Sequence, residues 1–179
     1  MAAPAADVSV RPARVEDTLA VAEVQVETWR ECYAPHLPPG ALDDLEVPLV
    51  EAGWRAAVTS PPSPNHRLLV ALSGGRLSGY VALGPAEDGD ATAEDGEIYA
   101  LTVAAAEQRL GHGSRLLSAA VDLLAGLGFS VIRMWTFDGD APLHTFLGGA
   151  GWAPDGATRV LVMGEDVGQQ RCHTRLRAP

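Results

Sequence analysis

The stretch Gln108-Arg109-Leu110-Gly111-His112-Gly113 decides the fold because of what stands on either side of it. An apolar, strand-like run at 98–103 precedes it, and an amphipathic, helix-like run at 114–127 follows it. The first N–H groups of a helix have no partners within the helix, and the helix dipole places partial positive charge there. Glycines at 111 and 113 let an anion approach the backbone, and Arg109 adds positive charge at the rim. The stretch therefore predicts a site for a phosphate-bearing ligand.

Two common phosphate-binding motifs do not fit this stretch. A Walker loop needs a lysine after its last glycine, and the chain has no lysine, since all 13 basic residues are arginine. A Rossmann fingerprint would need glycine at Leu116 and a position early in the chain. What remains is Gln-x-x-Gly-x-Gly after a strand that ends in Leu-Thr-Val, and this resembles motif A of the GCN5-related N-acetyltransferases (GNAT superfamily). The other interpretation of the turn is a glycine-rich helix cap without a ligand.

Length and composition predict one globular domain. A chain of 179 residues has room for a sizeable core, and 47% hydrophobic residues argue against disorder. We expect residues 1–7 to form a loose tail that is no signal peptide, and residues 8–176 to form a single domain. No stretch approaches a membrane span. Cys32 and Cys172 are too few and too separated for a disulfide scaffold, which predicts reduced thiols in a cytoplasmic protein.

The net charge of −10 argues against a nucleic-acid partner and is compatible with cationic amine substrates. The histidines at 36, 66, 144 and 173 show no metal-ligand spacing, so no metal is expected. Within the turn, His112 is expected to be an exposed filler, and Ser114 a hydroxyl near phosphate.

Hydrophobic periodicity predicts the element order βααβββαβαββ. The first helix opens at Glu16 or Asp17 and runs to about Cys32, with an apolar stripe of Leu19, Ala22, Val26, Trp29 and Tyr33. The expected strands cover 8–12, 68–72, 77–83, 97–103, 131–136, 158–163 and 171–176; the later helices cover the region of 42–54, then 111–126 and 141–149. The order resembles the GNAT fold, an α/β (α+β) arrangement around a mixed sheet, over roughly residues 8–176.

The loop at 84–96 carries five carboxylates and no positive charge. It is expected to be either a solvated hairpin tip or a cation-attracting lip of the acceptor site. A second segment, Trp29-x-x-x-Tyr33 followed by Leu37-Pro38, resembles the part of bacterial GNAT enzymes that lines the acceptor pocket, although core packing would also explain both aromatic residues.

Near the C-terminal end, Phe146-Leu147-x-x-x-Gly151-Trp152 resembles the end of the family's motif B, F-Y-x-x-x-G-F. The sequence departs from this pattern twice. Asp140 stands where the family usually has Asn, and Leu147 stands where it often has the Tyr that protonates the departing thiolate. The resemblance therefore places Leu147 beside the thioester sulfur without a proton to donate.

The resemblance also implies roles for the cofactor site. Backbone groups of Leu101, Thr102 and Val103 would lie along acetyl-pantetheine, with the Val103 N–H near the thioester oxygen. The turn would cradle the pyrophosphate. The implied acetyl-CoA-binding set is Leu101, Thr102, Val103, Gln108, Arg109, Leu110, Gly111, His112, Gly113, Ser114 and Asp140.

For catalysis, many family members carry a carboxylate early in the 97–103 strand, which makes Glu97 the expected base, directly or through water. Its other interpretation is a solvated glutamate at a loop edge. With Leu147 unable to donate, the acid is expected to be solvent, Tyr99 or His144, unless the step needs no dedicated acid.

The function implied by the resemblance is transfer of acetyl from acetyl-CoA to a primary amine of a small molecule or peptide by direct attack. One alternative is a non-catalytic module that senses acetyl-CoA, and another is transfer of a longer acyl group. A homodimer is compatible with family habit.

Overall fold

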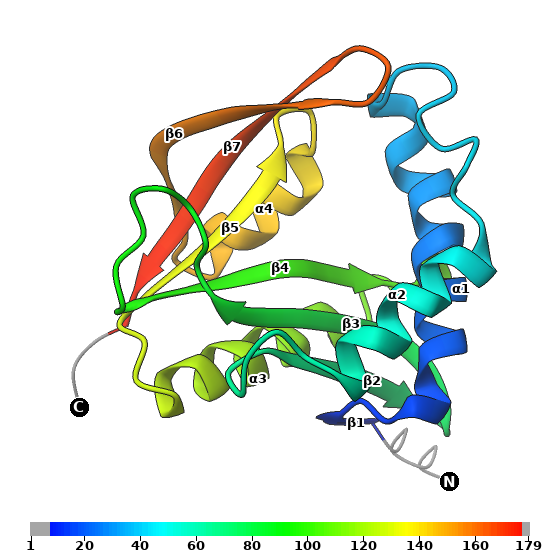
Figure 1. Cartoon of the computed structure of the whole chain (residues 1–179), viewed down its shortest axis with the longest axis horizontal. Helices are drawn as coiled ribbons and strands as arrows, with labels where there is room; N and C mark the ends of the chain where they lie inside the picture. Colours follow the sequence, from blue (N-terminus) through cyan, green and yellow to red (C-terminus); the bar gives the residue numbers. More distant parts are fainter. Residues whose placement is uncertain (1–7, 177–179) are drawn as a thin grey trace, which may run out of the picture.

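The structure is a computed structural model that describes residues 8–176, so the tail expected at residues 1–7 lies outside the described residues (Figure 1). Its element order is the predicted βααβββαβαββ. The strands are β1 Val8–Pro12, β2 Arg67–Ser73, β3 Arg76–Pro85, β4 Asp95–Val103, β5 Val131–Phe137, β6 Ala153–Val162 and β7 Asp166–Arg175. The helices are α1 Thr18–Thr28, α2 Val47–Thr59, α3 His112–Gly126 and α4 Ala141–Gly149, and a π-helical turn, Trp29–Tyr33, extends α1.

The seven strands form one mixed sheet in the order β1-β2-β3-β4-β5-β7-β6, in which only β4 and β5 are parallel. Helix α3 packs on one face, where its leucines join a core that also holds Leu147 of α4 and Trp152. Helices α1 and α2 cover the other face, around the fully buried Tyr80 of β3. Apolar residues that face both sides of the central strands explain this three-layer arrangement, and the predicted fold class is confirmed.

The apolar stripe predicted for α1 was partly wrong. Ala22 and Val26 are buried as expected, but Leu19 is 47% exposed and the buried positions include Val21 and Val24. The helix begins at Thr18, after a short 3₁₀ turn, and not at Glu16 or Asp17 as predicted. Its buried face is therefore shifted by about one residue relative to the predicted stripe. The helix still packs its apolar residues on β3 and β4.

The final hairpin is longer than predicted, because β6 begins at Ala153 and β7 at Asp166. Almost every residue of β6 is exposed, since it is the edge strand of the sheet. An exposed strand has no hydrophobic alternation that would reveal it in the sequence. In Figure 1 this hairpin reaches far beyond β5, toward the end of α1.

The pairing of β4 with β5 is what positions the site. The two strands pair at only three positions, Asp95–Val131, Gly96–Ile132 and Glu97–Arg133. Beyond Glu97, β4 continues to Val103 and β5 continues to Phe137 without pairing to each other. Both strands therefore leave backbone N–H and C=O groups unpaired along the opening between them, and a buried backbone group needs a partner.

Candidate active site

A cleft of about 720 Å³ lies where β4 and β5 separate. Its walls come from four parts of the chain: the end of α1 and the turn after it, the second half of β4, the phosphate turn with the first residues of α3, and α4. The lining residues are Thr28, Cys32, Tyr33, His36, Leu101, Thr102, Val103, Gln108, Arg109, Gly111, Gly113, Ser114, Asp140, Ala141, Pro142, Leu143, Thr145 and Phe146. Most residues of the predicted acetyl-CoA set are brought together here.

The predicted phosphate turn has the geometry of an anion-binding nest. Arg109 has φ +65° and Gly111 has φ +87°, so left-handed residues turn successive N–H groups toward one side at the start of α3. Arg109, Gly111, Gly113 and Ser114 line the cleft. Leu110 does not line it and is 61% exposed. The turn therefore contributes Arg109 and two glycines to the cleft wall, and its apolar side chain faces solvent.

His112 corrects the prediction of an exposed filler. It is only 2% exposed, and its Nδ1 lies 3.3 Å from the Ser78 hydroxyl. Its Nε2 lies 3.3 Å from a carboxylate oxygen of Glu107. The side chain points beneath the turn because the helix starts at this residue and its first face packs on β3. His112 thus supports the turn from inside the protein and does not line the cleft.

Gln108, the first residue of the motif, ties the turn to two walls of the cleft. Its side-chain amide donates to the Val103 carbonyl oxygen at 3.3 Å, and it lies 3.7 Å from the sulfur of Cys32. The contact with Cys32 joins positions 76 residues apart. No local pattern in the sequence would reveal such a contact, and Cys32 is a lining residue that sequence reasoning missed.

In α4, Asp140 lines the cleft and caps the helix, because its Oδ1 accepts from the Leu143 N–H at 3.0 Å. The expectation for Leu147 was wrong. Leu147 is 1% exposed and packs in the main core with Trp152 and is not part of the cleft wall. Its neighbour Phe146 lines the cleft instead. The motif located the helix correctly, but helix rotation decides which side chain faces the ligand.

The two aromatic residues after α1 have different positions. Tyr33 lines the cleft, whereas Trp29 packs behind it with ring centroids 5.4 Å apart. Phe137 at the end of β5 contacts both rings. Burial, and then the negative charge of Asp140, raises the pKa of the Tyr33 phenol above its ordinary value. A tyrosine is already protonated at neutral pH with its ordinary pKa, so the shift leaves the O–H in place and makes it a weaker acid.

Glu97 stands at the last paired position of β4 and β5, the vertex of the opening. Its neighbour Ile98 points into the core under α3, so Glu97 points to the opposite face of the sheet. The side chain is 7% exposed, which excludes the interpretation as a solvated loop-edge residue. Burial raises its pKa to about 7, repulsion by Asp88 adds to this, and the charge of Arg159 opposes it.

Neither weak acid candidate lines the cleft, and Glu97, although it stands at the vertex of the opening, is not among the lining residues either. The Tyr99 hydroxyl donates to the Pro85 carbonyl oxygen, and its ring stacks on His66 at 5.7 Å. His144 faces the sheet from α4, with Nε2 2.9 Å from the Thr136 hydroxyl. Both side chains are engaged elsewhere in the fold.

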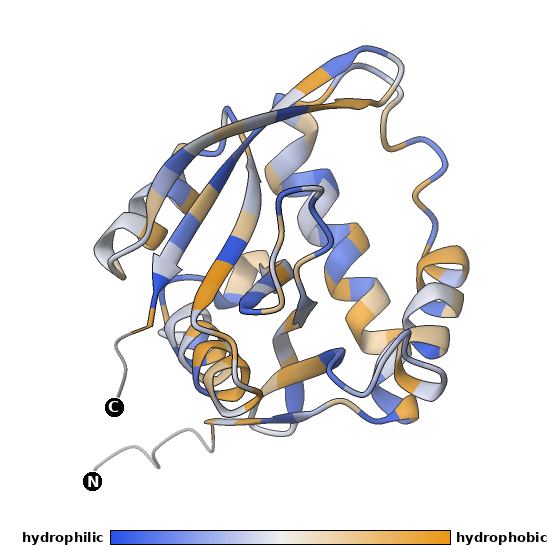
Figure 2. Ribbon diagram, turned by 60° about the vertical axis from the view of Figure 1, so that its left-hand side comes forward, coloured by the Kyte–Doolittle hydropathy of each residue, from blue (hydrophilic) through white to orange (hydrophobic). Residues whose placement is uncertain are grey.

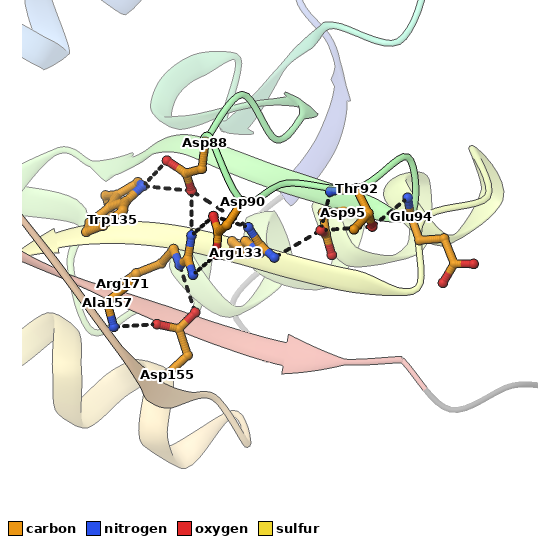
Figure 3. Close-up of polar contacts among 10 residues, drawn as sticks. All are labelled: Asp88, Asp90, Thr92, Glu94, Asp95, Arg133, Trp135, Asp155, Ala157 and Arg171. Carbon is orange, nitrogen blue, oxygen red and sulfur yellow. Dashed lines mark hydrogen bonds and ion pairs between the residues drawn. The ribbon is translucent and has the colours of Figure 1, made fainter.

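The acidic loop between β3 and β4 is solvated in part, as one expectation had it: Glu87, Asp90 and Glu94 are exposed, whereas Asp88 and Asp95 are held by side chains of β5 and β7. Arg171 of β7 is 6% exposed and donates to three aspartates (Figure 3). Its donor–acceptor distances are 2.9 Å to Asp88, 2.7 and 2.8 Å to Asp90, and 2.7 Å to Asp155. Hydrogen bonds from Arg171 hold the pKa of Asp90 below its usual range.

Two further side chains of β5 hold the same loop. Arg133 donates to Asp90 at 3.1 Å and to Asp95 at 2.9 Å, and the Trp135 indole N–H donates to Asp88 at 3.0 Å (Figure 3). Sequence reasoning missed this network because its partners are about 40 to 80 residues apart.

Known proteins resemble this chain in sequence and in fold. A family model described as the acetyltransferase (GNAT) family matches residues 24–149, well over half of the chain. The chain belongs to the GNAT family of acetyltransferases, and the predicted enzyme class, an acyltransferase, is confirmed. The uncharacterised N-acetyltransferase YuaI of Bacillus subtilis (strain 168) is 29% identical over 131 residues, which cover 73% of this chain and 72% of YuaI.

Solved structures share the fold at lower identity. PaiA N-acetyltransferase of Thermoplasma acidophilum, in complex with coenzyme A, has a TM-score of 0.72 and 15% identity, and the match covers 95% of this chain and 99% of PaiA. YncA of Salmonella typhimurium, with acetyl-CoA, has a TM-score of 0.72 and 20% identity, covering 95% and 94%. Ribosomal-protein-alanine N-acetyltransferase of Brucella melitensis has a TM-score of 0.73 and 17% identity, covering 94% and 99%.

Two other features are absent from residues 8–176: a membrane-spanning helix and a group of metal ligands. No helix among them is long and apolar enough to cross a membrane. No three of their His, Cys, Asp or Glu side chains are grouped as metal ligands would be.

Proposed function

We propose that this protein transfers the acetyl group of acetyl-CoA to a primary amine by direct attack. One observation carries the proposal: the phosphate turn and the unpaired half of β4 line the same cleft. A pyrophosphate at the start of α3 and an extended chain along β4 are what a CoA thioester needs from a protein surface. The CoA complexes of PaiA and YncA, which share the fold, agree with this use of the cleft.

The hydrogen bonds of β4 support a role for the Val103 N–H. Ala104 donates its N–H to Ser78 of β3. Successive N–H groups alternate between the two edges of a strand, so the N–H of Val103 points away from β3, toward the cleft. There it would donate to the thioester oxygen, whose negative charge grows as the amine attacks.

The chemistry needs two proton transfers. The amine nitrogen forms a bond to the thioester carbon, the carbon–sulfur bond breaks, and one proton leaves the nitrogen while the CoA sulfur gains one. Glu97 is the base that this proposal assigns, through water, because it stands at the vertex, faces away from α3, and has a pKa of about 7.

For the sulfur, Tyr99 and His144 are weaker candidates, because the Tyr99 hydroxyl donates to the Pro85 carbonyl oxygen and His144 contacts the Thr136 hydroxyl. Tyr33 does line the cleft, beside Asp140 at the start of α4, and its phenol is protonated at neutral pH. We assign the proton of the departing thiolate to Tyr33, with solvent as the alternative.

The test of the function combines binding and turnover. Acetyl-CoA at a hundred times its Kd should stabilise the native state by about 2.7 kcal/mol, which thermal unfolding would report as a raised Tm. NAD and ATP should do markedly less. Thiol release would then be followed with a panel of primary amines. Equal stabilisation by NAD would contradict the assignment of the cleft as an acetyl-CoA site. Tight binding of acetyl-CoA without release of CoA in the presence of any amine would favour a non-catalytic module that senses acetyl-CoA. Release of CoA from longer acyl-CoA thioesters at rates comparable to that from acetyl-CoA would favour the alternative function, transfer of a longer acyl group.

A further inference from the structure

Three arginines, Arg133, Arg159 and Arg171, lie around Trp135 on the face of the sheet that Glu97 points to. Arg133 and Arg171 are surrounded by aspartates. Arg159 has no carboxylate of residues 8–176 within ion-pair distance. Arg159 is exposed, and most other arginines among residues 8–176 make no ion pair either.

Arg159 is nevertheless held in place. Its Nε donates to the side-chain oxygen of Gln169 at 2.7 Å, and Gln169 is itself only 6% exposed. The guanidinium carbon lies 4.3 Å from the centre of the Trp135 ring, a cation–π contact. The terminal nitrogens Nη1 and Nη2 donate to no group among residues 8–176. An arginine fixed at Nε with both terminal nitrogens available is prepared for a planar anion such as a carboxylate.

The position of Arg159 relates it to the reaction. Trp135, beneath the guanidinium, lies two residues along β5 from Arg133, which pairs with Glu97. The charge of Arg159 reaches Glu97, since it lowers the pKa of that carboxyl, yet the two make no ion pair. The other charged groups that face Glu97 are Asp88 and Glu87, and Asp88 is engaged by Arg171 and Trp135.

Because the phosphate turn belongs to α3, CoA would enter from the side of α3 and α4, and the acceptor has to approach from the opposite face. That face offers a base that takes a proton from an amine and, a short distance away, an unpaired cation. A zwitterion has the complementary pair of charges. A polyamine or a cationic antibiotic would instead place positive charge against Arg159, and a protein N-terminus has no carboxylate beside its amine.

We propose that the acceptor is an α-amino acid or a close zwitterionic analogue, whose carboxylate is bound by Arg159 while its amine lies toward Glu97. This assignment rests on the proposed function and adds the substrate class to it. Arg159 is a specificity residue in this scheme, and it takes no part in the proton transfers.

The experiment compares acceptors that differ only in the carboxylate. Each of several amino acids, for example methionine, phenylalanine and glutamine, is assayed beside its amide and its decarboxylated amine, at equal concentrations of the uncharged amine. Because a hydrogen-bonded charged group is worth roughly ten- to a hundredfold in affinity, kcat/KM for the preferred amino acid should exceed that for its amide by about this factor. Assayed well above pH 7, where Glu97 is ionised with or without the charge of Arg159, Arg159→Gln should remove the difference while leaving the amide unchanged.

Two further variants sharpen the result. Arg159→Lys keeps the charge but not the fork, so it should restore only part of the preference. Arg76→Gln removes an exposed arginine from the β2–β3 turn and should leave every acceptor unchanged. Equal use of amino acids and amides by the wild type would overturn the proposal, as would an equal loss on both acceptors in Arg159→Gln.

A binding measurement keeps the inference separate from the proposed function. The CoA-loaded protein is titrated calorimetrically with the same amino acids and amides. Binding of an amino acid that weakens at least tenfold in Arg159→Gln supports the site even if no acceptor releases CoA, in which case the transferase proposal alone fails. Absence of carboxylate-dependent binding overturns the inference even if other amines are acetylated.

Discussion

At the scale of single residues, Glu97 shows how position creates a functional group. A glutamate in a strand has an ordinary pKa until the fold buries it. Here burial raises the pKa of Glu97, and Asp88, which the loop between β3 and β4 places nearby, raises it further. A base works best when its pKa is close to the working pH, and the value of about 7 meets this condition.

The first prediction is that Glu97→Gln removes from the pH–rate profile the rise near pH 7 that belongs to the carboxyl, while the rise caused by deprotonation of the amine at higher pH remains. The wild-type kcat/KM should rise as pH passes about 7, because the ionised carboxylate is the base. The variant should lose about 10²-fold or more near neutral pH and less at high pH, where free amine is abundant. Acetyl-CoA binding should be unchanged. A loss that is the same at every pH would assign Glu97 a structural role.

The ionised form of Glu97, which serves as the base, is the form that makes the folded protein less stable. The native state binds the Glu97 proton more tightly than the unfolded chain, so the stabilisation is present at low pH and is lost as pH rises through about 7. Glutamine does not ionise. The Tm of Glu97→Gln relative to the wild type should therefore increase between about pH 5.5 and about pH 8.5. Glu23→Gln, at an exposed position of α1, is the control without this trend.

A second residue-scale prediction concerns Tyr33→Phe. The ring contacts with Trp29 and Phe137 remain, so the fold and acetyl-CoA binding should be unaffected. Loss of the O–H should lower kcat by about 10²-fold if Tyr33 protonates the thiolate, since a general acid contributes about 10²–10⁴-fold. Single-turnover CoA release is the measurement. An unchanged kcat would mean that solvent supplies the proton.

At the scale of elements, the turn before α3 separates two roles of glycine. Gly111 has φ +87°, and a Cβ there would lie 3.1 Å from Nη1 of Arg115. Gly113 is helical, and a Cβ would meet only Phe146 and Val103 at ordinary contact distances of 3.6 and 3.7 Å. The first glycine is therefore required by the backbone, and the second keeps the cleft open.

The third prediction follows from this difference. Gly111→Ala should destabilise the protein by about 1–2 kcal/mol, because a left-handed conformation is costly for alanine. Gly113→Ala should change the free energy of unfolding by less than about 0.5 kcal/mol, yet weaken acetyl-CoA binding by about tenfold. Chemical denaturation and titration calorimetry measure the two effects. Normal acetyl-CoA binding by Gly113→Ala would contradict the assignment of the phosphate site.

At the scale of the whole molecule, the sheet consists of two parts joined along β4 and β5. Three residue pairs connect the strands themselves. The remaining connections are the Arg171 network, which ties the β3–β4 loop to β5 and β7, and a small apolar cluster that joins Leu37 to Phe137 and Val167. In Figure 2 the two parts diverge from their common vertex. The cleft exists because the parts are separate, and these contacts fix how far they separate.

The fourth prediction is that Arg171→Met costs about 2–4 kcal/mol of stability, because removing one partner of a buried ion pair leaves charges without compensation. Three aspartates lose their common partner in this variant. Arg55→Met removes an exposed ion pair with Glu51 on α2, and should cost less than about 0.5 kcal/mol. Urea unfolding compares the two. Equal costs would show that the Arg171 network does not hold the parts together.

The sequence by itself determined the element order, the family and the phosphate turn. These depend on short-range chemistry: apolar periodicity in α3, glycines that permit positive φ, and a turn between one strand and one helix. Asp140 was found through its place in the motif that resembles motif B, and the structure shows that it also caps α4. The element boundaries failed most at the final hairpin, where β6 has no buried face and β7 begins five residues before the prediction, and α2 also lies later than expected.

Only the tertiary structure decided which side chains face the cleft and which charges are paired. Leu147 and Phe146 are neighbours in the sequence, but one lies in the core and the other in the cleft, because the rotation of α4 is set by packing. His112 was expected outside and lies inside. Arg171 finds its aspartates, and Arg159 lacks one, through contacts between distant strands, and the free energy of such contacts depends on geometry that no local pattern of residues contains.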